Sequence, residues 1–162
     1  MPSYDTNTLI KSKLFQLLCS DAEVVSLLTN VTSPSVPNKN LMYKQIWPYK
    51  RVTDCCKDAK PQICFDIVIS RIDSWTICER MLEIVFLVPD SMMRTDTGTV
   101  ADRLENRVLK LFQGSRDFGI GRLLLKTSRP NESGDIPDGW QWRRLIFEVK
   151  DFNIKSDDPL WA

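Results

Sequence analysis

The feature that most constrains this chain is a pair of long alternating segments between residues 62 and 88. In residues 62–70 every second residue is large and apolar: Ile63, Phe65, Ile67 and Ile69. Residues 76–88 repeat the pattern with Cys78, Leu82, Ile84, Phe86 and Val88. A period of two is typical of a half-buried strand, and the polar break at residues 71–75 predicts a hairpin. The second strand would span about 43 Å at roughly 3.3 Å per residue, which is longer than most strands.

A helix is predicted directly after the hairpin, at residues 100–112. The apolar residues Val100, Leu104, Val108 and Leu111 form one stripe of a helix with 3.6 residues per turn. Thr99 and Asp102 match a capping box at its start, and Gly114 suits the position just past its end. A helix laid across a hairpin makes a compact core that contains no catalytic constellation.

The remaining elements are read from the same periodicities. Helices are predicted at residues 9–19 and, from a capping box formed by Ser20 and Glu23, to about residue 28. Strands are predicted at residues 41–47 (a short edge strand), 119–127 and 140–154. In the last of these the apolar residues change phase, which predicts a β-bulge near Lys150 and Asp151.

This order of elements predicts a single α+β domain spanning residues 1–162. We expect a mostly antiparallel sheet of four to five strands, with two N-terminal helices and one longer helix packed on one face. A long partner-contacting loop is expected at about residues 31–61, because loops of that length are uncommon in compact domains unless they are functional. A short C-terminal tail is expected at about residues 156–162.

The composition argues against catalysis. The chain of 162 residues contains no histidine, which removes the commonest general base and the commonest metal ligand. We therefore expect the protein not to be an enzyme and to use no cofactor. No apolar run approaches the roughly 20 residues that span a bilayer, and the N-terminus lacks the layout of a signal peptide. We expect no membrane contact and a chain kept in the cytoplasm, where cysteines stay reduced.

The cysteines do not have the spacing of a metal site. Structural zinc sites use cysteine pairs two to four residues apart, whereas Cys55 and Cys56 are adjacent and Cys64 and Cys78 lie inside strand patterns. We expect no bound metal, and we interpret Cys64, Cys78 and Cys19 as small buried packing residues. Gly119 and Gly121 form a Gly-x-Gly that follows a helix, so it is not the context of a dinucleotide-binding turn.

The second face of the long strand is a candidate subunit interface, because it mixes apolar and acidic residues. The candidate interface residues are Ile77, Glu79, Met81, Glu83 and Val85. Leu87 continues this face, and a face of this kind needs a neighbour or remains an exposed apolar patch. Glu79 and Glu83 would select the partner by pairing with basic residues of an adjacent subunit. The alternative, that Asp66, Glu79 and Glu83 perform acid–base chemistry, is less favoured than charges on a solvated or partner-facing surface.

The loop at residues 31–61 is a second candidate contact surface, because it is basic and aromatic. It holds six basic residues against two acidic ones, a local charge of +4. The candidate residues for a partner-facing or DNA-facing loop are Lys39, Tyr43, Lys44, Trp47, Tyr49, Lys50, Arg51, Lys57 and Lys60. Basic residues interleaved with aromatics suit a nucleic-acid backbone with base stacking, or a protein partner. The third interpretation is that the loop is exposed to solvent and binds no partner.

The whole layout resembles the tail-terminator and neck (head–tail joining) proteins of long-tailed bacteriophages. The resemblance rests on a helix pair followed by a long loop with Ile46-Trp-Pro-Tyr49, the strand Pro61-Gln-Ile-Cys-Phe-Asp-Ile67, the strand Glu79-Arg-Met-Leu-Glu-Ile-Val-Phe-Leu-Val88, the helix at residues 99–112, and the closing strand Trp142-Arg-Arg-Leu-Ile-Phe-Glu-Val149. It covers most of the chain, without a signature motif.

The resemblance implies a structural virion protein in the tail or neck, assembled in the host cytoplasm. It further implies a homo-oligomeric ring of six copies that binds the tail-tube protein and head-connector or neck proteins, with genomic DNA passing through the lumen. Two alternatives remain: a nucleic-acid-binding module that uses the loop at residues 31–61, and a small histidine-free hydrolase or nuclease. The mass of the purified particle discriminates the first interpretation from the other two, because only a ring has several times the monomer mass.

Overall fold

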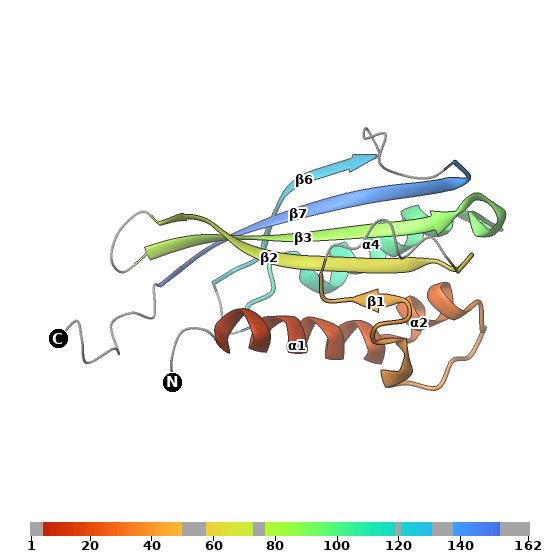
Figure 1. Ribbon diagram of the computed structural model, residues 1–162, viewed down its shortest axis with the longest axis horizontal. Coiled ribbons are helices and arrows are strands. Elements are labelled where there is room, and N and C mark those ends of the chain that lie inside the picture. The colour runs from red at the N-terminus through yellow and green to blue at the C-terminus, as the bar shows by residue number, and fades with distance from the viewer. Residues whose placement is uncertain (1–4, 50–57, 73–76, 119–120, 131–137, 153–162) are drawn as a thin grey trace.

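The computed structural model describes residues 5–49, 58–72, 77–118, 121–130 and 138–152. Within them, five strands form one sheet in the order β1-β2-β3-β7-β6. The strands are β1 (Ile46–Trp47), β2 (Gln62–Ile72), β3 (Ile77–Pro89), β6 (Leu124–Pro130) and β7 (Trp140–Phe152). All neighbours are antiparallel except β1 and β2, which are parallel. The predicted α+β class with a mostly antiparallel sheet is confirmed (Figure 1).

Helices cover one face of this sheet. They are α1 (Asp5–Ser20), α2 (Ala22–Thr29) and α4 (Val100–Phe112). In Figure 1, α4 lies behind the strands and α1 runs along the β1–β2 side. The helices and the facing strand residues share one apolar core, whose fully buried members include Ile10, Leu14, Leu18, Leu28, Ile63, Phe65, Leu82, Ile84, Phe86, Leu104, Val108, Phe112, Leu145 and Phe147. The predicted alternation is therefore confirmed where these residues are buried in that core: Ile63, Phe65, Ile67, Leu82, Ile84, Phe86 and Val88.

Local capping signals set the ends of α4. Thr99 is the N-cap, and its hydroxyl accepts a hydrogen bond of 3.1 Å from the Asp102 N–H. Gly114 follows the C-cap residue with a φ of +77°, a left-handed conformation that glycine adopts without a steric cost. Before the helix, a short 3-10 turn, η2 (Asp90–Met92), leads into a small hairpin formed by β4 (Arg94–Thr95) and β5 (Gly98–Thr99).

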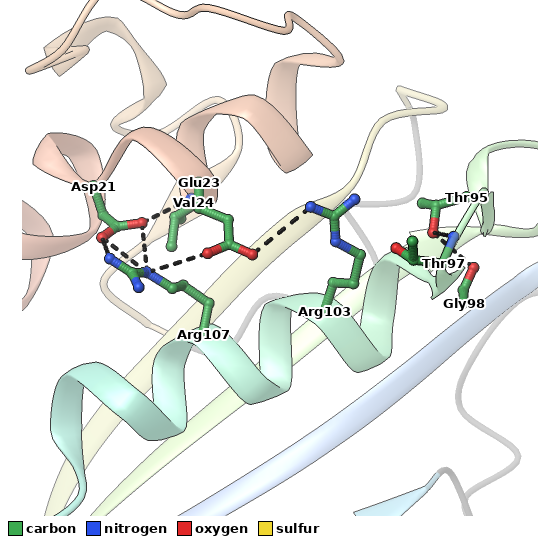
Figure 2. Close-up of polar contacts among 8 residues, drawn as sticks. All are labelled: Asp21, Glu23, Val24, Thr95, Thr97, Gly98, Arg103 and Arg107. Atoms are coloured by element: carbon green, nitrogen blue, oxygen red, sulfur yellow. Dashed lines mark hydrogen bonds and ion pairs between the residues drawn. The ribbon is translucent and has the colours of Figure 1, made fainter.

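The cap of α2 differs by one residue from the prediction. Ser20 is the last residue of α1, and Asp21 is the N-cap, with its carboxylate accepting a 3.0 Å hydrogen bond from the Val24 N–H. Asp21 also receives hydrogen bonds of 3.0 Å and 2.6 Å from Arg107 of α4. Figure 2 shows this arrangement, in which one carboxylate caps α2 and ties it to α4. An aspartate serves both purposes, whereas a serine cannot pair with an arginine as an ion.

Strands β6 and β7 differ from two of the predictions. β7 pairs with β3 in unbroken register from Ile77↔Phe152 to Pro89↔Trp140, so the predicted bulge near Lys150 and Asp151 is wrong. The register shifts lie elsewhere, between Ile69 and Arg71 in β2 and between Leu125 and Thr127 in β6. Residues 153–154 of the predicted strand lie outside the described residues.

The strand predicted at residues 119–127 begins later, at Leu124. The described residues before it turn back onto the end of α4 instead. The Leu123 N–H donates to the Ser115 carbonyl at 3.0 Å, and the Gly114 N–H donates to the Leu123 carbonyl at 2.8 Å. These bonds consume backbone groups that a strand would use, because each residue carries one donor and one acceptor.

The described part of the long loop is anchored to the fold. Buried Gln45 donates from its side-chain amide to the Leu28 carbonyl at 2.6 Å and to the Pro61 carbonyl at 2.9 Å. Upstream, the Asn38 N–H bonds the Cys19 carbonyl at 2.8 Å. The predicted edge strand at residues 41–47 is shortened to β1, because the 3-10 turn η1 (Lys39–Leu41) occupies its beginning. The loop from α2 to β1 is therefore a supported structure that presents its side chains in fixed positions.

Candidate subunit interface

The sheet face opposite the helices, which we call the outer face, carries paired charges. Glu83 of β3 lies 2.9 Å from the Arg144 guanidinium of β7, and Glu148 lies 3.4 Å from Lys126. At the open side of β2, Asp66 lies 2.7 Å from Lys11 of α1. Asp66 and Glu83 are direct neighbours in register, and each is neutralised by its own cation.

This pairing bears on two sequence-based hypotheses. The three carboxylates considered for acid–base chemistry are not equivalent: Asp66 and Glu83 each pair with a cation of the same chain, whereas Glu79 forms no ion pair with a described side chain. Glu83 was also expected to pair with a basic residue of an adjacent subunit. Its partner is instead Arg144 of the same chain, which the sequence alone does not reveal because the two residues are distant in sequence.

Part of the expected interface is already covered within the subunit. Val85 is 1% exposed and Leu87 is fully buried. They form a second apolar cluster on the outer face with Cys64 and Trp142, against which Trp47 and Trp140 pack. The expectation that this end of the face needs a neighbour is corrected, because tryptophans from β1 and β7 shield it. In the sequence of β7, Trp140 and Trp142 alternate with the inward-facing residues. This alternation could have predicted that the two tryptophans lie on the outer face and shield it.

The other end of the face is open. Val68 on the outer side and Ile69 on the inner side of β2 are 49% and 50% exposed. On β3, Met81 lies opposite Val68 and is half-buried, whereas Arg80 lies opposite Ile69 and is 5% exposed. Glu79 is half-buried and lies opposite Arg71. We call this end, residues 68–72 and 77–81, the hairpin arm. In Figure 1 it extends past α1 and α4. The side chain of Ile77, also a candidate interface residue, lies outside the described part of the chain.

The basic-aromatic loop forms a compact group of rings. The Tyr43, Trp47 and Tyr49 ring centroids lie 6.0–6.3 Å apart in tilted and edge-on arrangements. The Trp47 indole N–H donates to the Gln62 side-chain oxygen at 2.7 Å, which holds the central ring in place. We call these three residues the aromatic patch. Lys39, Lys44 and Lys60 are exposed, whereas the candidates Lys50, Arg51 and Lys57 lie outside the described residues.

The described cysteines behave as packing residues. Cys19 and Cys64 are free and buried, which confirms that interpretation for both. Burial raises the pKa of the Cys19 thiol. Among the described residues no group of three or more histidine, cysteine or acidic side chains is placed to hold a metal ion. Cys55, Cys56 and the Gly-x-Gly at residues 119–121 lie outside the described part, as does the side chain of Cys78.

A polar groove runs between α2, the β4–β5 hairpin and the start of α4. Its basic residues are Arg94 and Arg103, and Arg103 lies 3.7 Å from Glu23 of α2 (Figure 2). The Thr95 hydroxyl is engaged locally, since it donates to the Gly98 carbonyl at 2.8 Å. The groove walls are thus held by contacts within the fold, and they assemble no set of groups with a catalytic geometry.

The described residues form a small α+β fold with an open hairpin arm and a partly exposed aromatic patch. Comparison with known families gives its relationship: a family model described as YomW matches residues 12–149, and the chain belongs to this family. Membership associates the protein with bacteriophage. No curated protein sequence matches the chain. Among the described helices, none has the length and apolar character needed to cross a bilayer.

Proposed function

We propose that the protein is a structural virion component that forms a ring at the top of the phage tail or in the head–tail neck. In this role it ends growth of the tail tube and joins the tail to the head. Its family, which is phage-associated, and the resemblance of its layout to tail-terminator and neck proteins support this role. The observation that carries the proposal is the hairpin arm, whose apolar side chains on both faces its own helices leave uncovered.

The mechanism is geometric rather than catalytic. A head-to-tail contact between copies closes into a ring when the rotation between neighbours permits, and we propose six copies. One surface of the ring caps the last ring of tail-tube protein, and the other receives the head-connector or neck proteins. The DNA passes through the lumen. The protein is assembled in the host cytoplasm and retained in the virion. The absence of histidine from the chain fits a function without chemistry.

The experiment measures assembly and its consequence together. Mass photometry across a range of concentrations reports the particle mass, and purified tail-tube protein is polymerised with and without this protein while tube length is followed by negative-stain imaging. We expect a ring of several subunits and tubes that stop elongating once one end is capped. A protein that is monomeric at every concentration and leaves tube length unchanged contradicts the proposal.

A further inference from the structure

We infer that neighbouring copies meet where the hairpin arm of one copy docks on the aromatic patch of the next. This inference rests on the proposed ring and names the two surfaces that build it. The partner is therefore a second copy of this chain, and the contact is heterologous, with different surfaces on the two sides.

The arm has the properties of a segment inserted into a partner. Its exposed apolar residues, Val68 and Ile69, lie on opposite faces of one strand and are each about half exposed. A strand pair with one apolar face would lie flat on its own core, whereas one with apolar side chains on both faces gains most when both faces are covered. Helix lengths explain why the subunit itself does not cover it. A 13-residue helix such as α4 spans about 20 Å, whereas a 13-residue strand such as β3 spans about 43 Å.

The patch has the properties of a receiving surface. Tyr43 has a φ of +56° and is 53% exposed. The left-handed conformation is unfavourable for an ordinary residue, and asparagine or glycine would adopt it more readily. Its backbone is held there because the Tyr43 N–H donates to the Ile46 carbonyl at 3.0 Å. A tyrosine kept in solvent at a position unsuited to it indicates that the ring itself has a use.

Within one copy, Val68 of the arm and the central ring of the patch lie apart along β2. Trp47 of the patch is paired in register with Cys64 of β2, and Val68 of the arm lies four residues further along the same strand. At roughly 3.4 Å per residue, about 14 Å of rigid strand separates the two positions. A contact between Val68 and Trp47 therefore requires a second molecule. Because the two surfaces differ, repetition of the contact produces a closed ring or a helical filament rather than a two-fold dimer.

Charge complementarity favours this pairing of surfaces. Glu79 of the arm forms no ion pair with any side chain that the structure describes, whereas the nearby Glu83 and Asp66 each have a cation within the subunit. On the other side, Lys44 follows Tyr43 in sequence, and Lys60 precedes by two residues the Gln62 that binds Trp47. Both lysines are exposed and form no ion pair within the described residues. A carboxylate arriving with the arm would meet these lysines. Such exposed pairs set register and partner choice more than affinity.

The first test locates the contact by photo-crosslinking. Benzoylphenylalanine is placed at Val68, equal amounts of isotopically labelled and unlabelled protein are mixed, and cross-links in the assembled particle are mapped by tryptic digestion and mass spectrometry. We expect cross-links between copies to the tryptic peptides of residues 40–44 and 45–50, which carry the aromatic patch. The matched control is benzoylphenylalanine at Leu124, which is equally exposed (51%) but lies on β6, and it should not label these peptides. Cross-links from Val68 to Val68, or to another surface, overturn the inference.

The second test removes the patch without weakening the fold. In Tyr43→Asn the new residue tolerates the left-handed backbone better than tyrosine, so the free energy of unfolding should be unchanged or higher. We expect the concentration for half-assembly to rise about tenfold or more, as when a central aromatic is removed from an interface. Glu79→Lys should also weaken assembly, and Lys44→Glu combined with it should restore part of the loss.

The outcomes separate the inference from the proposed function. If rings form and cap tubes, but Tyr43→Asn assembles like the parent protein, the arm–patch contact is wrong while the ring proposal stands. If Tyr43→Asn leaves assembly unchanged but abolishes binding of a single-stranded oligonucleotide, the patch binds nucleic acid and the inference is overturned. If the parent protein never assembles, both the inference and the ring are overturned.

Discussion

Asp21 shows how much a single side chain contributes to this fold. Its carboxylate is nearly buried, caps α2 through the Val24 N–H and pairs with Arg107 of α4. Burial alone would raise the pKa of this carboxyl. The hydrogen bonds from Arg107 and from the Val24 backbone, together with the charge of Arg107, outweigh it and hold the Asp21 pKa below its ordinary value. The same hydrogen bond raises the pKa of Arg107.

This shift predicts a pH dependence of stability. A carboxyl whose pKa is lowered in the folded state stabilises the protein above its unfolded pKa of about 3.9, and the contribution is lost as the pH falls through the lower folded value.

Asp21→Asn keeps a capping oxygen but loses the charge. We expect it to lower the free energy of unfolding by about 1–2 kcal/mol at pH 7, and by much less below the folded pKa of Asp21. Urea denaturation between pH 2 and pH 7 measures this, with exposed Asp96→Asn as the control. A constant difference between parent and variant at all pH values would contradict the ionic contribution.

Helix α4 shows what local sequence decides at the scale of an element. Its start, its end and its apolar face are each encoded within a few residues, by the Thr99 cap, by Gly114 and by the stripe that includes Leu104 and Val108. The helix then lies across β3 and β7, where Arg143 forms ion pairs with Asp102 and, at 3.1 Å, with Glu105. Glu105 also accepts a hydrogen bond from Ser128 of β6.

The cap provides a test at this scale. Thr99→Ala removes the hydroxyl that accepts the Asp102 N–H, and we expect it to lower the free energy of unfolding by about 1 kcal/mol. The control is Thr97→Ala in the adjacent turn, where the side chain is exposed and a change within about 0.5 kcal/mol is expected. Equal effects of the two substitutions, measured by urea denaturation, would show that the Thr99 hydroxyl does not cap α4.

At the scale of the whole molecule, one core joins the helices to the inner face of the sheet. Phe86 of β3 is fully buried within it, among residues from all three helices. Phe86→Ala should lower the free energy of unfolding by roughly 3–5 kcal/mol, because it removes a large buried side chain and leaves a cavity. Val68→Ala on the hairpin arm should change the stability of the dispersed subunit by about 0.5 kcal/mol or less. An unchanged denaturation midpoint for Phe86→Ala would reverse the assignment of the inner face.

The candidate interface was only partly accessible from sequence. The pattern placed Glu79, Met81, Glu83 and Val85 on one face, and it identified the basic-aromatic loop. It did not indicate that Trp142 and Trp47 pack over Val85, nor that Arg144 forms an ion pair with Glu83. It also missed Val68 and Ile69, because periodicity alone does not reveal where the helical layer stops. The difference in length between the predicted helices and the predicted strands could have indicated that part of the hairpin extends beyond the helices.

The sequence by itself determined the strand pair, the helices and the caps of α4, because periodicity and capping depend on residues within one or two turns of each other. The tertiary structure alone decided which carboxylates are neutralised, which end of the outer face is shielded and where the hairpin arm emerges. Those features depend on residues such as Asp21 and Arg107, or Glu83 and Arg144, that are far apart in sequence. An alternating pattern shows which residues share a face, but only packing shows which part of that face the chain covers itself.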